Sequence, residues 1–150
     1  MNQADKLDLI FQTGKKIRFY MDAVIAETQE PIMSELSSLQ LKVAMQVHLN
    51  EPLSLSTLAT SLRLSNPSAS VLVEKLVEKE ILSREPDPDD RRKIQLRVHP
   101  HAHAALERMH QTLHQKFQQV ASKVGDENID KWYQVAMKIS EILDAENQNL

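Results

Sequence analysis

Polar and apolar side chains alternate strictly in the segment KIQLRV, residues 93–98. This period of two predicts a strand with one buried face and one face in solvent. We expect Ile94, Leu96 and Val98 on the buried side, and residues 81–85 as the partner strand of a hairpin. Because helical apolar spacing fills the rest of the chain, the hairpin restricts the fold to a mainly α-helical protein with a small β-hairpin.

The expected helices rest on apolar spacings of three and four residues and on local start signals. Ser37 and Gln40 make a capping box, and Ser54 and Ser65 are in position to cap two further helices. The predicted helices cover residues 5–28, 38–48, 55–62, 66–79, 100–124 and 127–146.

The two short helices, 55–62 and 66–79, are joined by a tight turn, as in a helix-turn-helix. The second of them presents small polar residues on its exposed N-terminal half, and such residues can approach base edges in the major groove of DNA. With the hairpin as a wing, residues 36–98 are predicted to form a winged helix-turn-helix DNA-binding domain. The residues expected to contact double-stranded DNA are Ser54, Arg63, Ser65, Asn66, Ser68, Ser70, Val71, Lys75, Arg91, Arg92 and Lys93.

The hairpin loop places acidic residues directly before basic ones, in the sequence DPDDRR. We expect Arg91 and Arg92 to reach phosphates or a narrow minor groove. Asp87, Asp89 and Asp90 are expected to support this wing by holding the arginines in fixed rotamers through ion pairs. The alternative is a surface ion-pair network that contributes little to stability.

Composition and charge narrow the possible functions. The net charge is −3, yet residues 54–98 hold eight Lys/Arg against seven Asp/Glu, a local net of +1. The absence of cysteine excludes disulfides and thiolate metal sites, and two glycines are too few for a phosphate-binding loop. With no converging acid, base and nucleophile, we expect neither an enzyme nor a cofactor. No apolar run approaches the roughly 20 residues of a membrane span and no signal peptide is found, so no membrane contact and a cytoplasmic location are expected.

The long helices 5–28, 100–124 and 127–146 each carry an apolar stripe that a single chain has too little surface to cover. An uncovered stripe indicates association, most simply a twofold dimer. We expect Trp132 and Tyr133 to lie in the core of that dimer rather than in a ligand site.

The segment LATSLRLSNPSASVLVEKLVEKEILSREPDPDDRRKIQLRV resembles the MarR family of winged-helix transcription regulators, most specifically in DPDDRR after a leucine-rich helix. The helices on either side resemble that family's dimerisation arm, so residues 1–35 and 99–150 are assigned to it. The resemblance implies a homodimer on a pseudo-palindromic operator and a ligand-responsive repressor. It also implies a pocket for a small aromatic or amphipathic effector, and we expect its ligand-binding residues to be Lys15, Arg18, Phe19 and His48.

Several positions depart from the family pattern. Val71 and Asp89 stand where basic residues are frequent, which leaves open a dimeric helical scaffold or interaction protein that has lost specific DNA binding. Arg63 and Glu80 stand at helix ends where glycine is usual. We expect a left-handed backbone at Arg63, which costs a non-glycine residue free energy, and an arginine side chain that reaches a phosphate.

Histidines raise the question of a metal site. His99, His101 and His103 alternate along the chain, and His110 and His114 lie four residues apart on a predicted helix, which is a metal-ligand spacing. Zinc-sensing relatives of the family add a glutamate and a histidine where this chain has Leu41 and Lys42, and a cysteine that it lacks. We therefore expect structural or solvent-facing histidines and no metal.

Overall fold

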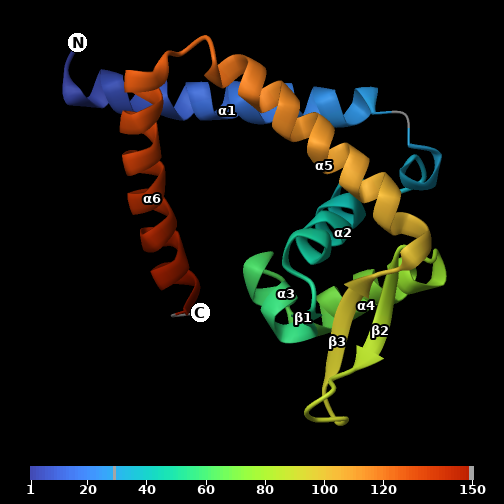
Figure 1. Ribbon diagram of the computed structural model, residues 1–150. Coiled ribbons are helices and arrows are strands. Elements are labelled where there is room, and N and C mark those ends of the chain that lie inside the picture. The colour runs from blue at the N-terminus through green and yellow to red at the C-terminus, as the bar shows by residue number, and fades with distance from the viewer. Residues whose placement is uncertain (29, 149–150) are drawn as a thin grey trace.

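The computed structural model describes residues 1–28 and 30–148 and shows a helical arm above a small mixed lobe (Figure 1). Helix α1 lies across the top, α5 descends from it into the lobe, and α6 descends on the other side. The elements are α1 (Gln3–Glu27), the 3-10 helix η1 (Pro31–Met33), α2 (Ser38–Asn50), β1 (Leu53–Ser54), α3 (Leu55–Ser61), α4 (Asn66–Glu78), β2 (Leu82–Pro86), β3 (Ile94–Val98), α5 (Pro100–Ala121) and α6 (Asp126–Gln148). The mainly helical fold with a winged helix-turn-helix is thus confirmed.

Local capping explains where the lobe helices begin. The Ser37 hydroxyl accepts from the Gln40 amide at 3.2 Å while the Gln40 side chain accepts from the Ser37 amide at 2.9 Å, which is the predicted capping box. Ser54 and Ser65 likewise accept from backbone amides in the first turns of α3 and α4. Each hydroxyl satisfies an amide that has no partner within its own helix.

The sheet has three antiparallel strands in the order β1-β3-β2. The predicted hairpin is present, but the short strand β1, in which Leu53 pairs with Leu96, was not predicted because two residues show no periodicity. The prediction that Ile94 is buried is wrong, since 45% of it is exposed. Ile94 pairs with Pro86 at the loop end of the hairpin, beyond the reach of β1.

One continuous hydrophobic core joins the lobe to the arm. Leu58, Leu76 and Leu96 from the lobe are almost completely buried together with Leu106 and Met109 of α5. The first half of α5 is therefore part of the lobe's core and holds the arm in a fixed position relative to it. The division into residues 36–98 and the two flanking segments stays a prediction.

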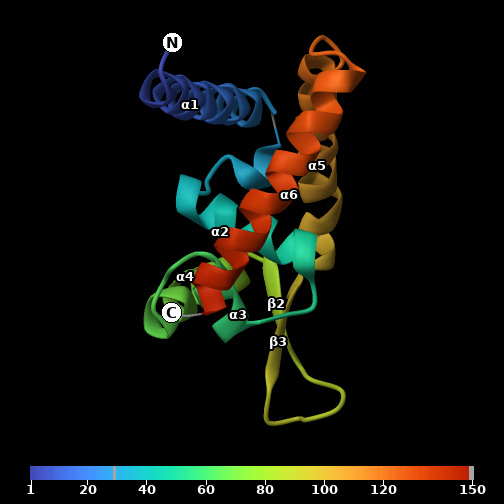
Figure 2. The same ribbon diagram turned by 90° about the vertical axis from the view of Figure 1, so that its left-hand side faces the viewer.

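The rest of the arm has apolar faces without cover in the single chain. In α1, Ile10, Phe11 and Phe19 are each about two-thirds exposed, at 66%, 65% and 68%. Val135 and Ile142 in α6 are also exposed. Figure 2 shows α6 running down in front of the lobe, and its contact with α5 near the top is a Phe117–Trp132 ring pair with centroids 5.5 Å apart. Trp132 thus packs within the chain while Tyr133 stays exposed. Within the described residues, no helix is long and apolar enough to cross a membrane.

Candidate DNA-binding surface

The turn between α3 and α4 positions the second helix of the pair. Arg63 has φ 53°, so the expected left-handed backbone is confirmed. The amide of Leu64 donates to the carbonyl of Ala59 at 2.8 Å, and the Arg63 amide donates to Thr60 at 3.1 Å. This is a Schellman end, which satisfies carbonyls of the last turn and usually carries glycine at the left-handed position. Glu80 (φ 56°) ends α4 in the same way.

Helix α4 presents the predicted polar face to solvent. Asn66, Ser68 and Lys75 are exposed, and Val71 is 52% exposed in their midst. Ser70 differs because it is half-buried and its hydroxyl and carbonyl lie 3.4 and 3.5 Å from the Arg84 guanidinium, which donates to both. Ser70 therefore links α4 to β2. The exposed surface of α4 is formed by small side chains such as Asn66, Ser68 and Val71.

The hydroxyls of Ser54 and Ser65 are occupied by capping. The Ser54 hydroxyl accepts from the Thr57 amide at 3.1 Å and lies 2.7 Å from the Thr57 hydroxyl. Ser65 accepts from the Ser68 amide and donates to the Ser68 hydroxyl at 2.8 Å. Both residues start their helices as predicted, whereas their contact with DNA stays a prediction.

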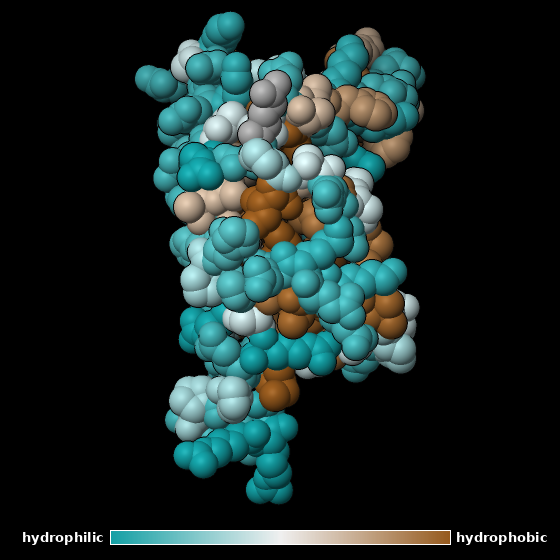
Figure 3. Space-filling view, turned by 90° about the vertical axis from the view of Figure 1, so that its right-hand side faces the viewer, coloured by the Kyte–Doolittle hydropathy of each residue, from teal (hydrophilic) through white to brown (hydrophobic). Residues whose placement is uncertain are grey.

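The wing projects below the lobe as a hydrophilic finger (Figures 2 and 3). Asp87 organises its loop, because one carboxylate oxygen accepts from the amides of Asp89 and Asp90 at 2.8 and 3.1 Å and the other accepts from the Gln95 side chain at 2.7 Å. The two backbone donors are the main reason that the pKa of Asp87 lies below its ordinary value. The loop therefore depends on an ionised Asp87.

The expected ion pairing of all three aspartates with the arginines is wrong. Among the described residues, the one such pair is Arg92 Nε to Asp90 Oδ1 at 3.7 Å, and the Arg92 side chain is 95% exposed. Asp90 instead accepts from the backbone amide of Arg92 at 3.1 Å. In a short loop the backbone amides lie within reach of a short carboxylate, whereas long arginine side chains stay hydrated. Asp87 and Asp90 support the wing's backbone, and Arg91, Arg92 and Lys93 stand in solvent.

Arg63 also contacts α6, which the sequence did not predict. The Arg63 guanidinium lies 3.9 Å from the carboxylate of Glu146, near the C-terminal end of α6. Both side chains are more than half exposed, so the pair is held weakly and Arg63 is accessible at the lobe surface. A signal for this contact is absent from the sequence, because it depends on how α6 returns to the lobe.

The predicted effector residues are not brought together. Lys15 lies over the ring of Phe11, Arg18 faces Asp22 within α1, and Phe19 points into solvent. His48 lies on α2 with its imidazole against Glu107 of α5 at 3.0 Å. None of these four residues lines any of five cavities found among the described residues.

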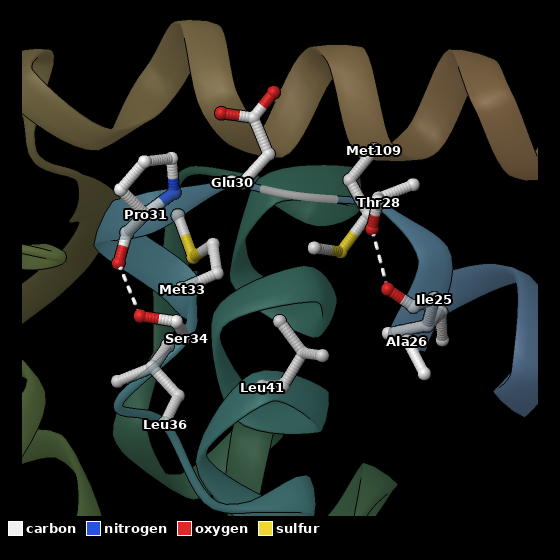
Figure 4. Close-up of a pocket in the computed structure, with 10 residues that line it drawn as sticks. All are labelled: Ile25, Ala26, Thr28, Glu30, Pro31, Met33, Ser34, Leu36, Leu41 and Met109. Carbon is white, nitrogen blue, oxygen red and sulfur yellow. Dashed lines mark hydrogen bonds between the residues drawn. The ribbon is translucent and has the colours of Figure 1, made fainter.

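A different cavity of about 450 Å³ lies where α1, η1, α2 and α5 meet (Figure 4). Met33, Leu41 and Met109 face it, and the hydroxyls of Thr28 and Ser34 donate to backbone carbonyls of the lining. The Glu30 carboxylate points toward α5, where Arg108 donates two hydrogen bonds at 2.7 and 3.0 Å. Figure 3 shows hydrophobic atoms at the surface between arm and lobe.

The fold and the surface define a winged helix-turn-helix protein, and comparisons with known proteins show which proteins it is similar to. Residues 36–94, from just before α2 to the start of β3, match the family model described as MarR family. No relative is found among the curated proteins. The family match places this segment in the MarR family.

Solved structures show that the similarity in fold extends over the whole chain. A MarR family protein from Bacillus stearothermophilus is 17% identical with a TM-score of 0.74, covering 96% of this chain and 99% of that one. Staphylococcus aureus MarR, in complex with salicylate and kanamycin, is 19% identical with a TM-score of 0.71, covering 96% and 95%. The transcriptional regulator BldR from Sulfolobus solfataricus is 22% identical with a TM-score of 0.64, covering 94% and 99%.

Replacing Arg63 by glycine should stabilise the free protein. Glycine adopts a positive φ without the cost that arginine bears, so we expect Arg63→Gly to raise the free energy of unfolding by about 1 kcal/mol. Glu80→Gly is the matched control for this backbone effect, since its φ is nearly the same. Thermal melts should show both variants more stable than the parent, and a less stable Arg63→Gly would contradict the left-handed turn.

The wing loop should lose its order in acid. Because the pKa of Asp87 is lower in the folded than in the unfolded chain, its stabilising effect is present above the ordinary aspartate value, near 4, and is lost as the pH falls through the lowered value. At pH 7, Asp87→Ala should make the amides of residues 89 and 90 mobile in NMR relaxation, whereas Asp89→Ala should not. Below the lowered pKa the parent should resemble Asp87→Ala, and a rigid loop in Asp87→Ala at pH 7 would refute the role of this carboxylate.

Proposed function

We propose that this chain is a DNA-binding transcription regulator that acts as a homodimer. The observation that carries the proposal is the free face of α4, where small side chains stand exposed, beside a wing whose cations have almost no partners. A helix about 10–12 Å wide fits the major groove of B-DNA, which is about 12 Å wide.

Helix α4 and the wing would make different kinds of contact with DNA. Ser68 and Asn66, near the N-terminal end of α4, are short enough to bring the helix close to base edges, and Val71 can contact a thymine methyl group. Arg91 and Arg92 at the wing tip would bind phosphates or enter the minor groove, which contributes affinity with little dependence on sequence. Arg63 would add a phosphate contact beside the groove, in competition with its weak pair to Glu146.

The exposed apolar faces of the arm support a dimer. A twofold dimer through α1, α5 and α6 would cover residues such as Phe11 and Ile142. It would also set two α4 helices against half-sites about one helical turn, some 34–36 Å, apart, which is why we expect a pseudo-palindromic operator.

The binding of an effector stays a prediction, and we now expect its pocket in the cavity between arm and lobe. The 450 Å³ cavity between arm and lobe has no Lys or Arg in its lining, and the neighbouring Arg108 is paired with Glu30. These features favour an apolar or aromatic molecule over a negatively charged one. Staphylococcus aureus MarR in complex with salicylate and MepR bound to ethidium bromide are relatives in fold that hold small aromatic molecules. A repressor that releases DNA on binding such a molecule is the regulation we propose.

Arg92→Ala should weaken DNA binding for every sequence. One phosphate contact per subunit is lost, so the slope of log affinity against log salt should fall by about 1 for each subunit. The control is Lys131→Ala, which removes the same charge from α6, where Lys131 pairs with Glu127. Gel-shifts at several salt concentrations on DNA from upstream of the chain's own gene are the measurement.

The same experiment separates regulator from scaffold. Val71→Ala should alter which base pairs are preferred while leaving the salt slope unchanged. Equal losses in Arg92→Ala and Lys131→Ala would show that net charge alone matters and that the wing assignment is wrong. A parent chain that shifts no duplex even at low salt would favour the scaffold that has lost DNA binding.

The full chain should sediment as a dimer of about twice 17.2 kDa at micromolar concentration. Removal of residues 127–150 should abolish the dimer, because it deletes the exposed apolar row of α6. Circular dichroism on the truncated chain would show whether the lobe is still folded. A folded monomer from the full chain would exclude the dimer.

A further inference from the structure

The C-terminal end of α2 and the first turns of α5 bring two histidines and a glutamate together. His48 and Glu51 come from α2 and the residue that follows it, and His103 comes from α5. One ligand atom from each of the three lies within 4.8 Å of the other two. Within the described part of the chain this is the one trio of such side chains that meets this distance.

The separation of two of the ligand atoms already suits a metal ion. His103 Nε2 lies 3.5 Å from Glu51 Oε1. Around a tetrahedral zinc ion with bonds of about 2.0–2.1 Å, neighbouring ligand atoms stand roughly 3.4 Å apart. The ligand atom of His48 lies within 4.8 Å of these two atoms. A small movement of His103, whose side chain is 53% exposed, would bring all three ligand atoms to the separations of a zinc site.

His48 is the buried member of the trio. Its side chain is only 6% exposed, its Nε2 faces Glu107 Oε2 at 3.0 Å, and its Nδ1 has no hydrogen-bond partner. A buried polar atom without a partner is costly, and native structures rarely contain one without a reason. Nδ1 is therefore the nitrogen that we assign to an ion, because Nε2 already contacts the Glu107 carboxylate. The same carboxylate–histidine arrangement fixes the tautomer and raises the basicity of histidines that bind zinc.

Neighbouring groups hold the remaining ligands in place. Glu51 Oε2 accepts from the Val98 amide at 2.7 Å, which leaves Oε1 directed at His103. The Glu107 carboxylate is itself fixed by the Gln111 side chain, which donates to Oε1 at 2.7 Å. Ligands oriented by a surrounding set of hydrogen bonds are typical of real metal sites.

We propose that His48, Glu51 and His103 bind a divalent zinc ion. Two imidazoles and one carboxylate form a ligand set that suits zinc, with water in the fourth position on the exposed side of His103. The predicted absence of metal covered His99, His101 and His103 as well as the pair His110 and His114, and for His103 the proposed site replaces it. The rings of His110 and His114 stand 6.3 Å apart, and neither belongs to the trio.

The site would join the DNA-binding lobe to the arm. His48 and Glu51 belong to the lobe, Glu51 holds β3 of the wing through Val98, and His103 belongs to α5. An ion bound to all three would add a further link between the end of α2, the wing strand β3 and the start of α5, which the core already holds together. If the proposed function holds, zinc and operator DNA affect each other's affinity by the same factor. The binding of the ion itself does not depend on that function.

The test is titration of the chelator-treated full chain with zinc by calorimetry, together with cobalt absorption as a report of tetrahedral coordination. We expect one ion per chain. His103→Gln and Glu51→Gln should each remove binding, and a glutamine at 51 can still accept from the Val98 amide. Glu107→Gln should weaken binding by roughly 10–100-fold without removing it, as for partners that orient a ligand. His114→Gln is the matched control and should bind as the parent does.

Thermal melts provide a second measurement. Zinc should raise the Tm of the parent and of His114→Gln but not that of His103→Gln, and melts without metal establish that each variant is folded. Absence of heat and of a cobalt spectrum at micromolar ion overturns the site. Binding that survives in His103→Gln and Glu51→Gln but is lost in His114→Gln overturns it equally. A chain that binds zinc through the trio but shifts no DNA would retain the metal site and reject the proposed function.

Discussion

The packing of the first half of α5 into the lobe is the constraint on which the rest of the structure depends. Leu106 and Met109 are buried among residues of α2, α3, α4 and the sheet, so the arm cannot change its angle without opening the core. Dense cores do not deform continuously, so a movement of α5 is transmitted to the lobe as a whole. The apolar cavity and the histidine–glutamate trio both lie along this junction, with Met109 lining one and His103 contributing to the other.

The wing shows how competition for hydrogen bonds decides the role of a charged residue. Asp87 could pair with an arginine or with backbone amides, and it binds the amides of Asp89 and Asp90. An amide in a tight loop lies within reach of the short Asp87 carboxylate, whereas an arginine at the tip is hydrated. The result is a loop whose shape is set by its anions and whose cations remain available to phosphate.

Non-glycine residues occupy two left-handed positions of the lobe, and each lowers the free energy of unfolding relative to glycine. Arg63 and Glu80 end α3 and α4 with the same Schellman hydrogen bonds. Arg63 stands beside the exposed face of α4, which gives a reason for an arginine at that position, whereas the structure offers none for Glu80. The contrast makes the pair a natural control for separating backbone strain from side-chain function.

The sequence alone determined what depends on near neighbours. The Ser37 capping box, the hairpin and the exposed face of α4 follow from residues within a few positions of one another, where caps, periodicity and turn geometry act. The left-handed backbone at Arg63 was expected from the family resemblance. The tertiary structure decided what depends on distant segments: the strand β1, the exposure of Ile94, the apolar cavity between arm and lobe, and the meeting of His48 with His103. These follow from how α2, the sheet and α5 pack together, and the sequence pattern of each element specifies which face is buried but not which side chains of another element lie against it.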